Sequence, residues 1–187
     1  MAYINSSTAT NRVKLIIIKA ADATKDADGN VKPVETDFYT AASNTTGAIT
    51  TLANGAIVVP GLQDITISNA NGSFRWKQLD QAGENVITTN ATNSLSGNFV
   101  LDPLTFFGDS GKTKAALDGI FKLSNERTQV AFLMAPEGVT DGKKLFVGNG
   151  FISALAPKVS ADSPVFVSPI TIEVNGDYDL KSAEVAA

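Results

Sequence analysis

The sequence predicts a mainly β fold, a β-sandwich or open barrel with one α-helix on an edge. Short runs rich in Val, Ile and Phe are separated by Gly, Asn, Asp and Pro, which is typical of strands and turns. One segment, residues 111–123, has apolar residues at helical spacing. The length of 187 residues suits one domain, so we expect residues 1–187 to form a single unit.

The first third of the chain predicts a hairpin followed by a long loop. Residues 13–18 are β-branched and apolar, as in a buried strand, and residues 26–30 predict a turn. Residues 34–39 alternate weakly and are expected to form the return strand. Residues 40–56 are small and polar without a clear period, so they predict a long loop, which is uncommon in a compact domain unless it has a function.

A second hairpin is predicted at Asn71-Gly72, the strongest short signal for a two-residue turn. If the flanking residues pair across this turn, Ile67 faces Trp76 and Phe74 lies on the same side. Because this register brings apolar side chains together, it predicts that Trp76 and Phe74 are core residues.

Two further strands are expected at residues 86–89 and 96–101. The helix at residues 111–123 is expected to begin at Asp109 or Ser110, either of which can cap it. One face of this helix would carry Thr113, Ala116, Leu117, Ile120 and Phe121, which fall at helical spacing.

The C-terminal third is the most informative part of the chain. Residues 127–134 predict a strand, and residues 145–159 and 165–176 predict two long strands joined by a short polar turn. Residues 177–187 are polar and predict a flexible tail. The last strand would place Ile170, Ile172 and Val174 on one face, and Thr171, Glu173 and Asn175 on the other.

Composition limits the function. The formal net charge is −4, which argues against gripping nucleic acid because that function needs a basic surface. The chain has no Cys and no His, so disulfides, thiolate catalysis and nearly all zinc sites are excluded. No apolar run approaches the roughly 20 residues of a membrane-spanning helix, and the N-terminus lacks a signal-peptide pattern. We expect no membrane anchor, no metal and no cofactor.

Two segments imitate ligand-binding motifs. Residues 108–113 resemble a phosphate-binding loop, but Phe106 stands where that motif needs its first Gly, so a helix cap is favoured. Residues 24–35 have calcium-loop spacing, but Thr24 begins the loop and Pro33 interrupts it, so a hairpin turn at Asp28-Gly29 is favoured. Isolated carboxylates such as Asp102 form no recognisable acid–base pair, and no enzyme is expected.

The C-terminal pattern resembles a protein family. Residues 146–153 read Phe-Val-Gly-Asn-Gly-Phe-Ile-Ser, and a polar turn and an alternating strand that ends at Gly176 follow. With the preceding helix and strand, this order resembles the tail-tube (major tail) proteins of long-tailed bacteriophages. The resemblance covers about residues 108–176. It implies a subunit that contributes strands to a closed multi-subunit β-barrel ring, with six subunits per ring and rings stacked into a hollow tube.

The resemblance also implies sites and partners. Residues 40–56 would form the loop that stacks on the next ring, with contacts from Asn44, Thr45, Thr46, Gly47, Ile49 and Leu52. Thr171 and Glu173 would face the lumen, through which double-stranded DNA passes without sequence-specific binding. Six copies would carry a formal charge of 6 × (−4) = −24 per ring.

Other implied partners are copies of the chain itself, a tape-measure protein, tail terminator and baseplate or tip proteins and, in contractile tails, a sheath. The implied location is the virion tail, after assembly in the host bacterial cytoplasm. Whether the tail contracts stays open. So do two alternative functions: a secretion-system tube or other virion structural protein, and a carbohydrate-binding β-sandwich module.

Overall fold

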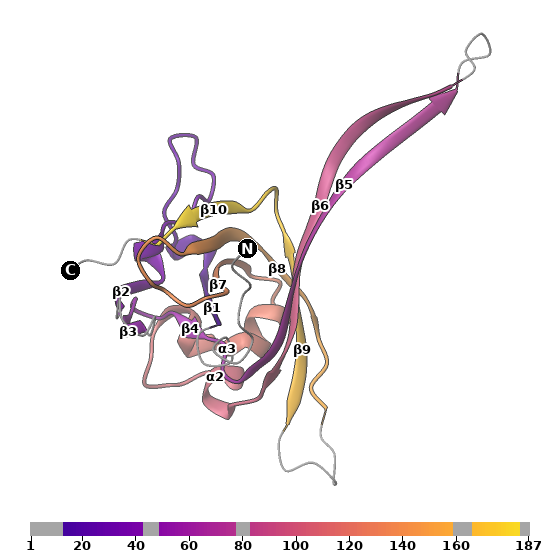
Figure 1. Cartoon of the computed structure of the whole chain (residues 1–187). Helices are drawn as coiled ribbons and strands as arrows, with labels where there is room; N and C mark the ends of the chain where they lie inside the picture. Colours follow the sequence, from indigo (N-terminus) through magenta and orange to yellow (C-terminus); the bar gives the residue numbers. More distant parts are fainter. Residues whose placement is uncertain (1–12, 43–48, 78–82, 159–165, 184–187) are drawn as a thin grey trace.

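The computed structural model describes residues 13–42, 49–77, 83–158 and 166–183. Figure 1 shows a body of strands and helices from which one long β-ribbon projects. The helices are the 3-10 turns η1 (Ala20–Asp22) and η2 (Glu35–Asp37), and α2 (Pro103–Phe107) and α3 (Lys114–Asn125). The strands are β1 (Lys14–Lys19), β2 (Tyr39–Ala42), β3 (Ile49–Leu52), β4 (Ile57–Val58), β5 (Leu62–Lys77), β6 (Glu84–Val100), β7 (Gln129–Ala135), β8 (Lys144–Leu155), β9 (Val167–Val174) and β10 (Asp179–Ser182).

Eight strands form one antiparallel sheet. Seven follow the order β4-β1-β7-β8-β9-β6-β5, and β10 pairs with β8 outside this path. The predicted mainly β fold is confirmed, and the ends of β1, β7, β8 and β9 lie within four residues of the predicted bounds. Among the described strands, β4 and β5 stand at opposite ends of the order, so this part of one chain does not close into a barrel.

One face of the sheet packs against α2 and α3 over the main core. Leu95, Phe132, Ile170 and Ile172 are buried there beneath helix side chains. The Phe-x-Gly-x-Gly-x-Ile pattern of β8 lies on this face, and its first glycine makes room for an aromatic ring. A Cβ on Gly148 would lie 2.9 Å from the ring of Phe132, so the small residue allows this core to close.

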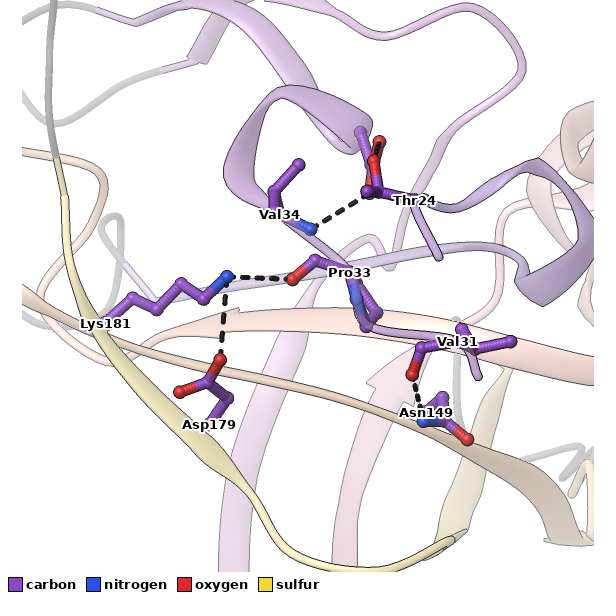
Figure 2. Close-up of polar contacts among 8 residues, drawn as sticks. Thr24, Val31, Pro33, Val34, Asn149, Asp179 and Lys181 are labelled. Carbon is purple, nitrogen blue, oxygen red and sulfur yellow. Dashed lines mark hydrogen bonds and ion pairs between the residues drawn. The ribbon is translucent and has the colours of Figure 1, made fainter. Parts of the chain in front are cut away.

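Residues 20–42 cover part of the opposite face, over β1, β7 and the first half of β8. Leu133, Leu145 and Phe38 are among the residues buried in this second core. Figure 2 shows how the covering segment is attached: the Asn149 side chain donates a hydrogen bond to the Val31 carbonyl at 3.0 Å, and Lys181 Nζ donates to the Pro33 carbonyl at 2.9 Å.

The prediction that residues 34–39 form a return strand is wrong. Asp37 accepts hydrogen bonds from the backbone N–H groups of Thr24 and Val34, and from the Thr24 hydroxyl. These contacts turn residues 35–37 into η2, and the strand β2 begins only at Tyr39. Within the predicted loop 40–56, β2 and β3 pair with each other, and residues 43–48 lie outside the described part of the chain.

The hairpin predicted at Asn71-Gly72 is also wrong, because β5 runs straight through both residues. Its partner is β6, a single strand where two were predicted, and Ile67 faces Leu95 rather than Trp76. The Asn-Gly signal marks a bulge instead: the register shifts between Ala70 and Gly72.

The predicted helix 111–123 is confirmed as α3 with shifted bounds, and a second short helix, α2, precedes it. Asp109 accepts a hydrogen bond from Gly111 N–H within its own loop instead of capping the helix. Helix α3 therefore begins after Thr113, three residues later than predicted. Residues 103–107 form α2, capped by Asp102, which accepts from Thr105 N–H at 2.9 Å. The Asp-Pro pair at the start of α2 is a helix signal that was not recognised in the sequence.

The predicted apolar face of α3 is only partly correct. Gly119 has φ 73° and ψ 166°, which breaks the helix into two pieces, so side chains before and after it do not share one helical face. Ala115, Ile120 and Leu123 are buried, whereas Leu117 and Phe121 are exposed.

The prediction of a flexible tail from residue 177 is wrong for β10. Asp179–Ser182 pair with residues 144–147 of β8, and Ala183 is buried in the second core. Residues 184–187 lie outside the described part of the chain.

Asp118 links the helical layer to the sheet. It is almost fully buried and pairs with Lys122 at 2.7 Å and with Lys19 of β1. Hydrogen bonds from Lys122 and Lys19 lower the pKa of Asp118. A carboxylate with a lowered pKa contributes stability above its unfolded-state pKa, and this contribution is lost as the pH falls through the folded-state pKa.

We therefore expect Asp118→Asn to lower the free energy of unfolding by about 1–3 kcal/mol at pH 7. The difference from the unsubstituted protein should shrink as the pH falls below about 4. Urea unfolding at pH 7 and pH 3 measures both effects. Glu126→Gln is the matched control, because Glu126 contacts the same Lys122 at 3.9 Å on the exposed surface. An equal loss in both variants would contradict the role of Asp118.

Candidate functional site: an open polar face and a projecting arm

Beyond Asn149, the face of the sheet opposite the helices is no longer covered by residues 20–42. Side chains of β5, β6 and β9 on this side are half-buried or exposed, whereas their alternate neighbours lie in the core. We call this surface the open polar face. Its members are Asp64, Thr66, Ser68, Ser94, Ser96, Asn98, Thr171 and Glu173.

Strand register aligns these side chains in rows across the sheet. One row crosses Ser68, Ser94 and Glu173, and a second crosses Thr66, Ser96 and Thr171. A third row crosses Asp64 and Asn98. Because directly opposite residues point to the same side of a sheet, these rows form a continuous surface of short polar side chains. On β8 the first row continues to the exposed ring of Phe151, which stands opposite Glu173.

The charged members of the open polar face, Asp64 and Glu173, are both acidic and each has a hydrogen-bond partner. Asp64 accepts from the backbone N–H and the side-chain amide of Asn98, each at 2.8 Å. The Ser153 hydroxyl lies 3.4 Å from a Glu173 carboxylate oxygen. A surface with short hydroxyl and amide groups and fixed negative charges offers phosphate groups no cationic partner.

The predicted division of the last strand into two faces is confirmed by burial. Ile170 and Ile172 lie in the core, and Thr171 and Glu173 lie on the open polar face. Their role in a lumen stays a prediction. Of the six predicted stacking residues, Ile49 and Leu52 are the ends of β3, and Asn44, Thr45, Thr46 and Gly47 lie outside the described residues.

The second feature is the arm, which we define as residues 69–77 of β5 and 84–93 of β6. The ladder between β6 and β9 ends at Ser94 and Glu173, so the arm continues as a ribbon of two strands. Figure 1 shows it extending far from the body. The arm was not predicted from the sequence, because the expected strands divided β5 and β6 into shorter pieces.

The base of the arm is fixed to the turn after β9. Asn93 is buried, and its side-chain amide donates to the Gly176 carbonyl and the Asp177 carboxylate. The Tyr178 hydroxyl donates to the Ser94 carbonyl and lies 3.1 Å from the Ser68 carbonyl oxygen, so it contacts both strands. Burial, together with the charge of Glu173, raises the pKa of Tyr178.

The arm carries apolar side chains in solvent. Phe74 is 55% exposed, its cross-strand partner Ile87 is 50% exposed, and Val86 is also exposed. The ring of Phe74 stacks with that of Trp76 at 6.0 Å. The prediction of Phe74 and Trp76 as core residues is therefore wrong, because the register that would have buried them does not exist.

The described residues hold no cluster of three or more acidic, His or Cys side chains suited to a metal ion. In the calcium-like loop, the Asp26 carboxylate is occupied by the loop itself: it accepts from Asp28 N–H and from Asn30, whose backbone hydrogen bond lowers the pKa of Asp26. The predicted turn there is confirmed. No helix in the described ranges has the length and hydropathy to cross a membrane.

No protein-family model matches the sequence, and a search of curated proteins found no match. Similar solved structures exist. A chain of the SPP1 tail tube aligns with a TM-score of 0.54 at 11% identity, covering 94% of this chain and 78% of that one. Chains from the tail of an empty GTA particle with C6 symmetry and from a native gene transfer agent virion align at 0.49 and 0.47, each at 12% identity. The first covers 81% of this chain and 100% of its own, and the second 66% and 87%.

The similarity to the SPP1 chain extends over nearly the whole of this protein. The chain therefore has a tail-tube fold, and the resemblance noted in residues 108–176 is confirmed at the level of the fold.

Proposed function

We propose that this chain is the structural subunit of a bacteriophage-type tail tube, in which rings of copies stack into a hollow tube. The observation that carries the proposal is the half-covered sheet. One face is packed beneath α2 and α3, while the other opens through Asp64, Ser94, Ser96 and Glu173 as a continuous polar surface. A sheet of this kind can form the wall of a tube, with helices packed on its outer face and polar side chains facing the solvent inside.

The unpaired edge of the sheet, formed by β5, supports assembly into a ring. Among the described strands, β5 pairs with β6 alone, so the outer side of this 16-residue strand presents unpaired backbone groups. An exposed edge of this length templates pairing with another chain, and closure into a ring removes it. Six copies per ring is the number implied by the family resemblance.

In the proposed tube, the open polar face lines the lumen, with Thr171 and Glu173 on its surface. Acidic and small polar side chains let double-stranded DNA pass without adhering, because each phosphate meets neutral or negative groups. Residues 40–56 contribute to stacking, and Ile49 and Leu52 bring partly exposed apolar side chains to that contact.

The proposal places the protein in the virion tail. Its partners are further copies of itself, a tape-measure protein and the terminator and baseplate or tip proteins, with a sheath where the tail contracts. A secretion-system tube subunit would use the same surfaces, so the cargo in the lumen distinguishes the two proteins.

Negative-stain electron microscopy of the concentrated protein tests this function. We expect hollow rings or tubes, and the ring symmetry can be counted from end-on views. A second preparation lacking residues 43–48 tests the stacking segment: rings without long tubes are expected. Monomers at high concentration, with and without tip or tape-measure extract as seeds, would exclude the tube function. Long tubes from the shortened chain would exclude the stacking role alone.

A further inference from the structure

The turn after β9 lies at the point where the arm leaves the sheet. β9 ends at Val174, and β10 rejoins the sheet on β8, where Asp179 pairs with Val147. Between the two strands the chain turns at Gly176, whose φ of 87° is left-handed and suits glycine. Figure 1 shows β10 and the arm leading in different directions from this turn. The turn therefore separates the two branches of the sheet.

The body holds the Tyr178 hydroxyl against the base of the arm. The Tyr178 ring packs edge-on against Phe132 and Phe146, at centroid distances of 6.3 and 6.0 Å. Its hydroxyl donates to the Ser94 carbonyl and lies 3.1 Å from the Ser68 carbonyl oxygen. Ser68 and Ser94 are directly opposite each other in the ladder, in the row next to the arm. One side chain packed in the body thus contacts both strands of the ribbon.

Asn93 supplies a second contact, one residue further along β6. Its amide nitrogen donates to the Gly176 carbonyl at 3.0 Å and to the Asp177 carboxylate at 2.9 Å. Only 2% of Asn93 is exposed, and its amide oxygen has no hydrogen-bond partner among the described residues. Because an unpartnered buried oxygen costs about 1–3 kcal/mol, an apolar side chain would pack here at lower cost. What the amide adds is a fixed direction between the arm and the turn.

The two contacts restrain the arm as a lever is restrained at its base. A ribbon held at one row can tilt about that row, whereas a ribbon held at the successive rows of Ser94 and Asn93 keeps its direction and its twist. Beyond them an open hollow, lined by Asn71, Asn90 and Asp177, separates the arm from the turn. The arm spans about 30 Å, so a tilt of about 20° at its base would move its far end by roughly 10 Å.

We propose that Asn93 and Tyr178 are positioning residues that aim the arm in the free subunit. The direction of the arm is then a property of the single chain, set by the turn after β9 before the arm meets any partner. The inference goes beyond the proposed function, because it holds for a subunit that has not assembled. It gives a role to Asp177 and Tyr178, which the sequence placed in a flexible tail.

The distance between two spin labels tests the aim of the arm, and the sequence has no Cys that would take a label elsewhere. Lys77→Cys places one label at the far end of β5, and Glu126→Cys places the other at the exposed end of α3. Pulsed electron paramagnetic resonance is measured on free subunits, kept dilute and checked by size-exclusion chromatography. We expect a single narrow distance distribution when these are the only substitutions.

Tyr178→Phe then removes the hydroxyl and keeps the ring, and Asn93→Leu removes both N–H donors at similar volume. Each should widen the distance distribution about twofold or more, because the length of the arm magnifies a small tilt at its base. Tyr39→Phe is the matched control, since the Tyr39 hydroxyl donates to Glu35 at 2.6 Å beside the second core. This control should lower the melting temperature at least as much as Tyr178→Phe, because its lost hydrogen bond is to a carboxylate, and should leave the distribution narrow.

Three results would overturn the positioning role. The first is a narrow distribution in both Tyr178→Phe and Asn93→Leu. The second is a broad distribution without either substitution, which would mean that the arm takes its direction from a partner. The third is equal widening by Tyr39→Phe, which would mean that any lost hydrogen bond loosens the arm. Electron microscopy of the concentrated protein tests the tube function separately: tubes from a chain with a broad distribution overturn the positioning role alone, and a narrow distribution without tubes overturns the tube function alone.

Discussion

Gly119→Ala is expected to destabilise the protein by about 2–6 kcal/mol, enough to unfold many domains of this size. Gly119 has φ 73° and ψ 166°, a backbone conformation that is essentially restricted to glycine and strains other residues by about 1–3 kcal/mol. Its added Cβ would also lie 2.3 Å from the backbone nitrogen of Gly108 and 2.6 Å from the carbonyl oxygen of Phe106. Backbone atoms cannot move aside as a flexible side chain does, so overpacking adds roughly another 1–3 kcal/mol.

Gly142→Ala separates the two causes. Gly142 has nearly the same φ, 74°, but nothing lies within 4 Å of the position that a Cβ would occupy there. This variant should lose only the conformational part, about 1–2 kcal/mol. Guanidinium unfolding of the two variants beside the unsubstituted protein gives both differences. Equal losses would mean that the close crossing between residues 108 and 119 does not limit packing.

The close approach of Gly119 to Gly108 also explains why helical periodicity predicted the wrong apolar face for α3. Leu117, Ile120 and Phe121 stand at helical spacing in the sequence. The non-helical backbone at Gly119 breaks this spacing, so Leu117 does not share a helix face with Ile120 and Phe121. Ile120 enters the core, while Leu117 and Phe121 stay in solvent. A glycine inside a periodic pattern is a weak signal for such a break, and only the neighbouring backbone at Gly108 shows why glycine is required.

Strands that cross the middle of the sheet were the easiest to predict. β1, β7, β8 and β9 are long apolar or alternating runs whose pattern follows directly from burial on one or both faces. The arm was harder, because its outer half is exposed on both sides and has no alternation to follow. There the Asn71-Gly72 sequence favours a local two-residue turn. The strands instead pair between residues up to 37 positions apart, as in Leu62 with Phe99.

The open polar face could be predicted only one strand at a time. Thr171 and Glu173 were assigned to one side of β9 from alternation alone, and the structure confirms this side as the one outside the core, with Thr171 half-buried and Glu173 exposed. The rows that extend it through Ser94 and Ser68 depend on register among three strands, and register is not encoded in any single segment. The function proposed for this face therefore depends on a juxtaposition that only the fold provides.

Glu173→Lys should make the proposed lumen wall retain DNA, which the unsubstituted wall is proposed to let pass. Glu173 is exposed in the row with Ser94 and Ser68. In the proposed six-subunit ring, the substitution changes the charge by 6 × (+2) = +12 on the lumen wall. Cationic side chains bind phosphate with an affinity that falls steeply with salt. Short duplex DNA added during assembly should therefore co-sediment with the variant tubes at about 50 mM salt and be released at about 200 mM salt.

Resistance to nuclease then shows on which side of the wall the DNA lies. Glu126→Lys is the control, since Glu126 is an exposed residue at the end of α3, in the helical layer on the other face of the sheet. It introduces the same charge change on the outside of the proposed tube. DNA held by Glu173→Lys tubes should be protected from nuclease, and DNA held by Glu126→Lys tubes should be digested. If the protection is reversed, the helices line the lumen. If Glu173→Lys tubes retain no more DNA than the unsubstituted tubes, the open polar face is not the lumen wall, because a wall that carries this charge in every ring cannot avoid the phosphates that pass it.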